Sequence, residues 1–144
     1  MRTVEGSQSA GGFRFALVVS KYHDFVTDRL QAGAVAALAA AGVRPDDVTV
    51  VRVPGAFELP FAARRAAASG AFDAIVCLGC LVRGATASGE IGVPITFGVL
   101  TTNSIEEALQ RAADGPSNKG WEAAAAAVEM AIVSAALHPG VPSR

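Results

Sequence analysis

The chain has 144 residues, enough for one domain that buries roughly 70% of the surface its unfolded form exposes. Its 12 lysines and arginines are balanced by 13 aspartates and glutamates, so the net charge of -1 offers no electrostatic footprint for nucleic acid or an anionic membrane surface. The apolar fraction of 51% exceeds what the core of one small monomer needs, which leaves apolar surface for other subunits to cover. We therefore expect a homo-oligomer that binds small molecules.

Both ends of the chain are predicted to be less ordered than the single domain between them. Residues 1–12 are polar and glycine-rich and look like a loose arm, and residues 138–144 look like a frayed tail. The N-terminal residues have no apolar core of the kind a signal peptide needs, and Glu129 interrupts the longest apolar run. These features predict a cytoplasmic protein that does not enter the membrane.

Four short apolar or β-branched runs are predicted to be strands: Arg14–Ser20, Val48–Val53, Ala74–Leu81 and Pro94–Leu100. They lack the strict alternation of half-exposed strands, which indicates buried parallel strands. Four alanine- and leucine-rich stretches alternate with them and are predicted to be helices: Thr27–Ala41, Pro60–Ser69, Ser104–Ala113 and Gly120–Leu137. This alternation predicts an α/β fold in which helices flank a four-stranded parallel sheet.

Local sequence signals support the helix boundaries. Ser104 with Glu107 fits a capping box, Gly42 is expected to end the first helix, and Pro60 suits a first helical position. Residues Ala123–Ala127 give the last helix a face with almost no side-chain bulk. We therefore expect that helix to lie between the sheet and a neighbouring helix.

Cys77 and Cys80 form a C-x-x-C pair, a pattern that can mark redox chemistry or half of a zinc site. Residues three apart on a strand point to opposite faces, so the two sulfurs could neither form a disulfide nor share a metal. A zinc site would need further ligands, whereas the histidines of the chain are His23 and His138. We predict buried structural thiols and no metal site.

Tyr22, His23 and Phe25 follow the first predicted strand. In open α/β sheets ligands bind beyond the carboxyl ends of the strands, where an aromatic ring can stack on a flat heterocycle. Alternatively, Tyr22 and Phe25 cap the core beneath the loop, and position in the sequence does not decide between the two. His23 by itself is typical of a solvated loop residue.

Residues 53–60, VPGAFELP, follow the second predicted strand with a proline–glycine turn and a helix start. The loop is therefore expected to be stiff. It would hold Phe57, Glu58 and backbone N–H groups near a helix N-terminus, where they offer a ligand apolar contact and a hydrogen-bond acceptor. The alternative is an ordinary strand-to-helix connection with Phe57 in the core.

Residues 82–86, VRGAT, follow the third predicted strand. Glycine lets backbone N–H groups turn inward and threonine adds a hydroxyl, so the segment could cradle a phosphate, although many loops contain both residues. Arg111, after the fourth strand, could clamp the same phosphate with its bidentate guanidinium. Alternatively Arg111 pairs with Glu107 one helical turn earlier, and spacing alone favours that pair.

The stretches VPGAFELP, LGCLVRGAT, FGVLTT and NKGWEAAAAAVEM occur in the order in which the lumazine synthase family has them. The chain resembles that family from about Phe13 to Leu137. The resemblance implies a flavodoxin-like fold and the condensation of 5-amino-6-ribitylaminouracil with 3,4-dihydroxy-2-butanone 4-phosphate to 6,7-dimethyl-8-ribityllumazine, a step of riboflavin biosynthesis. It implies no metal and no redox cofactor.

The resemblance also implies which residues form the site. The residues that match the family's contacts to the pyrimidine and ribityl chain are Tyr22, Ala56, Phe57, Glu58, Cys80, Leu81, Val82 and Phe97. Those that match its phosphate site are Ala85, Thr86 and Arg111. In the family the aromatic equivalent to Phe97 comes from the adjacent subunit, so each pocket would be shared by two chains. The family assembles as pentamers, in some members as icosahedral shells of twelve pentamers.

One stretch departs from the family pattern. After Thr86 the family continues with its catalytic histidine and a full helix, whereas this chain passes through Ala87–Ile91 directly to Gly92. A parallel crossover takes a dozen or more residues and usually includes a helix. We therefore predict that one crossover helix is missing. Without it, apolar surface on one face of the last two strands is expected to be uncovered. His23, where the family usually has asparagine, could act as a substitute base, although nothing in the sequence fixes its ring toward the reacting atoms.

Two hypotheses of different classes follow. The first is a lumazine synthase. The second is a non-catalytic or impaired assembly protein on the same scaffold, which would bind the ribityl-pyrimidine without turnover. A plain flavodoxin-like protein that binds a phosphorylated ligand is a distant third, because it ignores the paired family motifs.

Overall fold

A computed structural model describes residues 1–81 and 93–137. The strands and helices in chain order are β1 (Phe15–Ser20), α1 (Asp24–Ala40), β2 (Val48–Val53), α2 (Leu59–Ala68), β3 (Ala74–Leu81), β4 (Ile95–Thr101), α3 (Ile105–Arg111) and α4 (Lys119–Ala136). Short 3-10 turns lie at Pro45–Asp47 (η1) and Ala56–Glu58 (η2). The predicted strands are confirmed to within one residue at each end. The first helix begins earlier than predicted, at Asp24 instead of Thr27.

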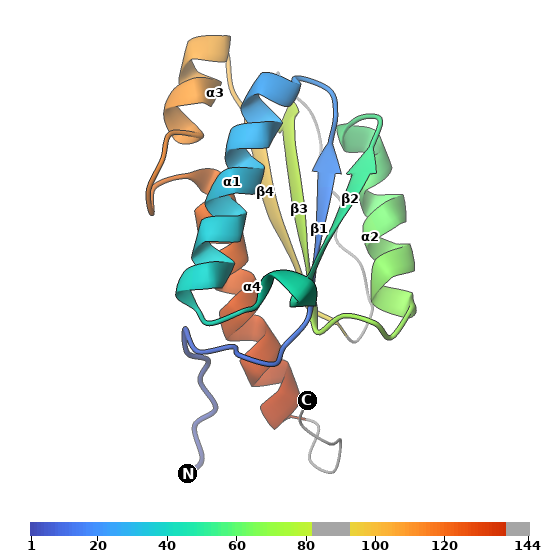
Figure 1. The fold of residues 1–144 in the computed structure, drawn as a ribbon, viewed down its shortest axis with the longest axis vertical. Coiled ribbons are helices and arrows are strands. Elements are labelled where there is room, and N and C mark those ends of the chain that lie inside the picture. The colour runs from blue at the N-terminus through green and yellow to red at the C-terminus, as the bar shows by residue number, and fades with distance from the viewer. Residues whose placement is uncertain (82–92, 138–144) are drawn as a thin grey trace.

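The four strands form one parallel sheet in the order β2-β1-β3-β4 (Figure 1). β1 lies in the middle, with Phe15 opposite Val48 of β2 on one side and Ala74 of β3 on the other. All six residues of β1 are buried because strands flank it and helices cover both faces. The predicted α/β class is confirmed, and the strand order is that of a flavodoxin-like sheet.

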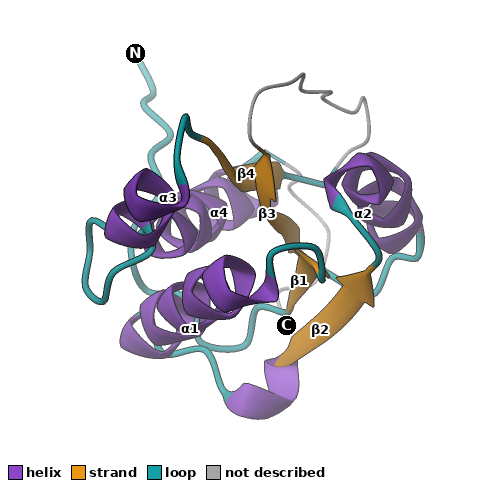
Figure 2. Ribbon diagram, turned by 90° about the horizontal axis from the view of Figure 1, so that it is seen from above, coloured by secondary structure: helices purple, strands orange, loops and turns teal. Residues whose placement is uncertain are grey.

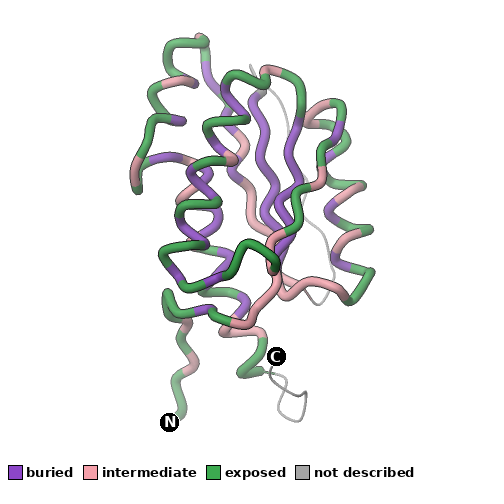
Figure 3. Tube along the Cα trace, in the orientation of Figure 1, coloured by how far each residue is buried: buried purple, intermediate pink, exposed green. Residues whose placement is uncertain are grey.

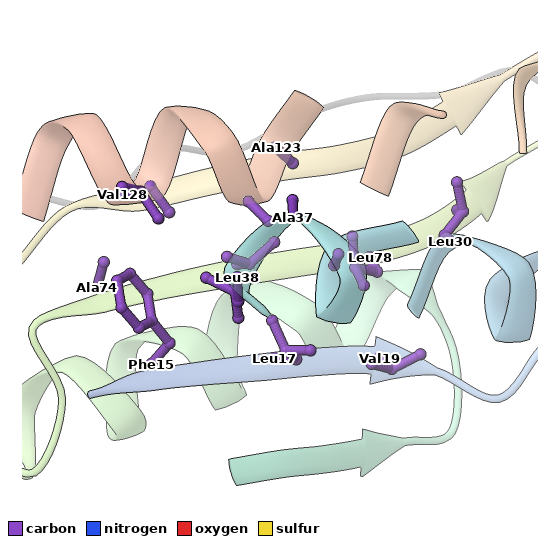
Figure 4. Close-up of a cluster of buried hydrophobic side chains, with 14 of the residues drawn as sticks. Phe15, Leu17, Val19, Leu30, Ala37, Leu38, Ala74, Leu78, Ala123 and Val128 are labelled. Carbon is purple, nitrogen blue, oxygen red and sulfur yellow. The ribbon is translucent and has the colours of Figure 1, made fainter. Parts of the chain in front are cut away.

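The helices divide unequally between the two faces of the sheet. Seen from above, α1, α3 and α4 lie on one side and α2 lies on the other (Figure 2). The larger core cluster fills the space beneath α1 and α4, and Figure 4 shows Phe15, Leu17 and Leu78 of the sheet pointing toward Leu38 and Val128 of these helices. We call this side the α1/α4 face, and the opposite side the α2 face.

α4 packs against α1 and the sheet, which confirms the predicted place of the last helix. Two glycines make this contact close. A Cβ at Gly120 of α4 would overlap the backbone carbonyl of Leu30 in α1, and a Cβ at Gly33 of α1 would overlap the side chain of Asn118. Small residues therefore set the distance between the two helices.

Asn118 joins α4 to its neighbours. Its Oδ1 accepts hydrogen bonds from the backbone N–H groups of Gly120 at 2.8 Å and Trp121 at 3.1 Å, which caps α4. Its Nδ2 donates to the carbonyl of Arg29 in α1 at 3.1 Å and to that of Ala112 after α3 at 2.9 Å. One buried side chain thus satisfies backbone groups from three helices.

The other helix boundaries follow the predicted signals closely. Gly42 ends α1 with a left-handed φ of 85°. Pro60 occupies the first turn of α2, one residue later than predicted. At α3 the Ser104 hydroxyl accepts from the N–H of Glu107 at 3.2 Å, while the Glu107 carboxylate accepts from the N–H of Asn103 at 3.1 Å instead of closing on Ser104 itself.

The α2 face is less complete at β4. A second smaller cluster packs beneath α2, and Ile95, Phe97 and Val99 of β4 extend it as half-buried side chains (Figure 3). The chain moves across the sheet in the same direction from β3 to β4 as from β2 to β3. Because such connections are right-handed, any helix that joined β3 to β4 would lie on this face. Among the described helices α2 is the one that lies there. The prediction of an uncovered face on the last two strands therefore holds only in part, because the β4 side chains are half-buried whereas Ile75 and Cys77 of β3 are fully buried on the same face.

The N-terminal residues, predicted to be a loose arm, are held in part. Gln8 donates from Nε2 to the Ala125 carbonyl of α4 at 3.0 Å, and a Cβ at Gly6 would overlap the backbone of Glu129. Ala10 is fully buried. The N-terminus and the end of α4 both lie beyond the amino ends of the strands (Figure 1).

Candidate functional site

The candidate site lies at the carboxyl edge of the sheet, the end at which all four strands terminate (Figure 1). The strand order reverses between β1 and β3, since the chain leaves β1 toward β2 and returns on the other side to β3. In open parallel sheets this switch point leaves a crevice in which ligands bind. The segments that follow β1, β2 and β4 reach this edge.

The segment after β1 is held by its backbone while its aromatic side chain stays exposed. The N–H of Lys21 donates to the Val53 carbonyl of β2 at 2.8 Å, and the N–H of Tyr22 donates to the buried Ser20 hydroxyl at 3.2 Å. The Tyr22 side chain is nevertheless 64% exposed, and Phe25 is 45% exposed. The alternative that these rings cap the core is therefore wrong.

His23 adopts a left-handed backbone conformation, with φ 57° and ψ 52°, at the N-cap of α1. Its side chain caps no N–H group of the helix. Its carbonyl accepts from the N–H groups of Val26 at 2.9 Å and Thr27 at 3.1 Å, which starts the helix at Asp24. The sequence did not reveal this early start, because histidine is not among the preferred N-cap residues.

The loop after β2 has the compact form expected of VPGAFELP. The Glu58 N–H donates to the Gly55 carbonyl at 3.2 Å and closes the η2 turn. Phe57 is 77% exposed, so the alternative that places it in the core is wrong, whereas Ala56 is half-buried against the cluster beneath α2. Glu58 lies at the N-cap of α2 and its exposed carboxylate caps no N–H group of that helix. Its oxygens are therefore available to accept hydrogen bonds from a ligand.

The two cysteines of β3 lie on opposite faces of the sheet, as predicted. Cys77 belongs to the cluster beneath α2 and Cys80 to the cluster beneath α1 and α4, and both thiols are free. Burial raises the pKa of Cys77 to about 12 and also raises the pKa of Cys80, because a thiolate is poorly solvated there. Neither is a nucleophilic thiolate at neutral pH, which confirms the structural interpretation.

Cys80 is nearest the carboxyl edge of the two. It borders a cavity of about 10 Å³ together with His23 after β1 and Thr102 and Ser104 after β4. Thr102 and Ser104 were not predicted as residues of this edge, although their position directly behind the last strand is the signal that could have found them. Leu81 ends β3 at the same edge.

Phe97 lies away from the other candidate residues within one chain. It stands opposite Cys77 in the β3–β4 register, and Cys77 in turn stands opposite Val18 in the middle of β1. It is half-buried on the α2 face. The fold therefore does not bring Phe97 to the carboxyl edge where Tyr22 and Phe57 lie.

Arg111 ends α3 and is exposed. The expected pair with Glu107 is not formed; the Glu107 carboxylate accepts from the Asn103 N–H at 3.1 Å. Within residues 1–81 and 93–137 no ion pair involves Arg111. The other predicted substrate and phosphate residues, Val82, Ala85 and Thr86, lie outside the described residues, as does the crossover from Ala87 to Ile91.

A membrane-spanning helix and a cluster of metal ligands are both absent from the described part of the chain. None of its helices is both long and apolar enough to cross a bilayer. Within the same residues no three side chains of histidine, cysteine, aspartate or glutamate gather closely enough to hold a metal ion.

Similarity to known proteins supports the family resemblance that the order of the motifs indicates. A 6,7-dimethyl-8-ribityllumazine synthase from Syntrophus aciditrophicus strain SB is 46% identical over 142 residues, which cover 88% of this chain and 92% of the relative. Those of Desulfatibacillum aliphaticivorans and Chlorobaculum tepidum are each 43% identical. The alignments cover 90% of this chain and 94% of the first relative, and 91% of this chain and 95% of the second.

The same comparisons locate the departure from the family. The alignment with the Desulfatibacillum protein spans 145 positions, whereas 90% of 144 residues is about 130, so about 15 positions belong to the relative alone. The sequence profile of the 6,7-dimethyl-8-ribityllumazine synthase family matches in two segments, residues 12–91 and 87–135, which meet where the crossover helix was predicted to be missing. Together the two segments span most of the domain. The chain belongs to the 6,7-dimethyl-8-ribityllumazine synthase family.

Proposed function

We propose that this protein is a lumazine synthase of riboflavin biosynthesis. It condenses 5-amino-6-ribitylaminouracil with 3,4-dihydroxy-2-butanone 4-phosphate, releases phosphate and water, and forms 6,7-dimethyl-8-ribityllumazine. The observation that carries the proposal is the exposure of Tyr22, Phe57 and Glu58 on fixed loops at the carboxyl edge, at the positions that match the family's pyrimidine site.

In the proposed site Tyr22 stacks on the pyrimidine ring. Ala56 and Phe57 provide apolar contact, and the Glu58 carboxylate accepts hydrogen bonds from the ribityl hydroxyls. The fixed backbone supports these roles, because Tyr22 N–H donates to the Ser20 hydroxyl and Glu58 N–H closes the η2 turn. A site on such loops loses little conformational entropy when the substrate binds.

The remaining substrate contacts come from β3 and from a second chain. Cys80, Leu81 and Val82 line the same pocket through their backbone groups. Phe97 completes the pocket of a neighbouring subunit. Its half-buried position on the α2 face, away from its own carboxyl edge, supports this arrangement.

Arg111 binds the phosphate of the second substrate together with Ala85 and Thr86. The exposed guanidinium without an ion-pair partner in the described residues supports this role, because a bidentate fork is free to meet two phosphate oxygens.

Catalysis then depends on holding two reactive molecules together, which can supply a large part of a rate enhancement without a proton-transfer group. The family's catalytic histidine has no counterpart after Thr86 in this sequence. A positioned proton-transfer group typically contributes about 10²-fold to 10⁴-fold, so we expect turnover lower by that factor than in a version with the helix restored.

The proposed assembly is a pentamer, alone or within a larger icosahedral shell, in the cytoplasm. The half-buried apolar side chains of β4 on the α2 face support contact with further chains, since water penalises such surface. Light scattering at micromolar concentration checks this, and a stable monomer contradicts it.

The phosphate site can be tested with one variant and one matched control. Arg111→Ala should weaken binding of the butanone phosphate about 10-fold or more while leaving binding of the ribityl-pyrimidine nearly intact, because the lost contact is charge-assisted. Arg44→Ala is the control. Arg44 is an exposed arginine before β2, at the amino edge, where it pairs with Asp47 at 3.1 Å. Equal loss of both ligands in Arg111→Ala would assign Arg111 a structural role.

The activity itself is tested by product formation. The chain and a version with a family crossover helix and histidine inserted after Thr86 are assayed for 6,7-dimethyl-8-ribityllumazine at equal assembly state. Product from the chain as it stands supports the synthase. Binding of the ribityl-pyrimidine without any product would favour the non-catalytic assembly protein instead.

A further inference from the structure

We infer that His23 is a positioning residue that fixes the ring of Tyr22 for stacking on the pyrimidine. The inference rests on the proposed function, because it assigns His23 a part in preparing the same site. Neither the sequence pattern nor the family match gives His23 this role.

The ring of His23 contacts the neighbouring rings of Tyr22 and Phe25. The His23 ring centroid lies 4.3 Å from that of Tyr22 at an interplanar angle of 60°, and 5.8 Å from that of Phe25 at 83°. Both are edge-to-face contacts, the geometry that aromatic pairs favour. His23 is half-buried, whereas the two rings on either side of it are exposed. The imidazole therefore braces two side chains that would otherwise move in solvent.

The backbone at residue 23 does not require a histidine. The left-handed conformation of residue 23 is adopted most readily by glycine, and asparagine and histidine both tolerate it. Since the His23 side chain caps no N–H group of α1, asparagine or glycine would serve the helix start at least as well. What an imidazole adds at this position is its ring, and the ring contacts Tyr22 and Phe25.

The imidazole lies beside the ends of two strands. His23 borders the cavity of about 10 Å³ beside Cys80 of β3, Thr102 and Ala108. That space is too small for either substrate and holds at most about one water. His23 thus lies close to the ends of β3 and β4 and to the start of α3, while its ring contacts Tyr22.

The energetic consequence concerns binding and not the chemical step. A tyrosine side chain that is 64% exposed loses rotamer freedom when it stacks on a ligand. If His23 already restricts the ring, that cost is met before the substrate arrives. Loss of the imidazole should therefore weaken binding of the ribityl-pyrimidine while the turnover of bound substrates stays nearly constant.

The experiment exploits the fact that Tyr22 is the single tyrosine of the chain. Biosynthetic labelling with 3-fluorotyrosine gives one ¹⁹F resonance, which reports the surroundings of the ring in the full-length free protein. We compare wild type with His23→Gly and His23→Asn, which suit the backbone but lack the ring, and with His23→Phe, which keeps a ring. Kd and KM for 5-amino-6-ribitylaminouracil and kcat are measured for the same proteins.

We expect His23→Gly and His23→Asn to move the resonance toward that of the unfolded chain and to raise Kd about 3-fold to 10-fold, the size expected for the loss of one aromatic pair. His23→Phe should keep both values near wild type. An unchanged resonance and Kd in His23→Gly and His23→Asn would overturn the inference. So would a fall in kcat without a change in Kd, since that would assign His23 to proton transfer. Failure of wild type to bind the ribityl-pyrimidine would instead contradict the proposed function.

Discussion

The two faces of the sheet are built differently. On the α1/α4 face, Gly33, Gly120 and the buried N-cap residue Asn118 allow α1 and α4 to pack closely. Leu100 of β4 is buried beneath these helices. On the α2 face the side chains at the centre of the sheet are equally buried, but Ile95 and its neighbours along β4 are only half-buried. A family scaffold can therefore keep its central core while one edge strand is left with an incomplete cover.

This difference separates stability from assembly. The α1/α4 face contains the contacts that the subunit needs to fold, because they are complete within one chain. The outer part of the α2 face contains apolar surface that one chain does not fully bury. Substitutions on the first face should act on the subunit, and substitutions at β4 on the second should act on contacts between subunits.

The largest effect is expected where the two helices touch most closely. Gly120→Ala should lower the free energy of unfolding by about 3 kcal/mol or more, because the added methyl group would overlap the Leu30 carbonyl and backbone atoms cannot move aside singly. Gly79→Ala on the α2 face is the matched control. There the nearest atom is Cδ1 of the flexible Leu59 side chain at 3.0 Å, so the loss should be about 1 kcal/mol or less. Urea unfolding measures both, and similar losses would contradict the difference between the faces.

A second pair of substitutions compares the two faces of the same strand. Leu100→Ala should cost about 2–5 kcal/mol, since it opens a cavity beneath α4 in a fully buried region. Ile95→Ala should cost about 1–2 kcal/mol, because part of that side chain already meets solvent. Chemical denaturation followed by circular dichroism is the measurement. The expectation for Ile95→Ala applies to the separated subunit, where an equally large loss would contradict the difference between the two faces; a larger loss in the assembled protein alone would reflect the proposed contacts between subunits.

The last effect, a dependence of stability on pH, concerns the thiol beneath α2 and vanishes at neutral pH. The unfolded chain releases the Cys77 proton near the ordinary pKa of 9.0, whereas the folded chain keeps it up to about 12. The contribution of the protonated Cys77 thiol to the free energy of unfolding is therefore fully present below pH 9. It is lost as the pH rises toward 12, by at most about 1.4 kcal/mol per pH unit. Unfolding of wild type and of Cys77→Ala between about pH 8 and pH 10.5 should show a shallower decline for the variant. Identical slopes would show that Cys77 is less shielded than its position in the core indicates.

Most of the fold could be predicted from the sequence. Buried parallel strands are continuous apolar runs, and β2 and β3 therefore have the bounds that Val48–Val53 and Ala74–Leu81 indicated. The start of α1 could not be predicted, because a left-handed His23 leaves no cap signal. The contact between Gly6 and Glu129 could not be predicted either, since the two residues are far apart in the sequence and only the folded chain brings the N-terminal arm next to α4.

The candidate site was predictable in composition but not in geometry. The family motifs gave Tyr22, Phe57 and Glu58, and parallel topology put the loops that carry them at one edge. Whether the rings lie in the core or in solvent depends on the turn after each strand, and only the structure decided this. The expected Arg111–Glu107 pair is absent, and the Glu107 carboxylate accepts from the Asn103 N–H, a contact that helical spacing does not reveal.

The positions of the chain ends have a practical consequence for fusion proteins. The N-terminal arm leaves the domain beyond the amino ends of the strands, and Gln8 fastens it to α4 on the way. The candidate site lies at the other end of every strand. A tag, dye or cargo domain attached before Met1 therefore points away from the substrate loops of its own subunit, and a linker added there need not be long.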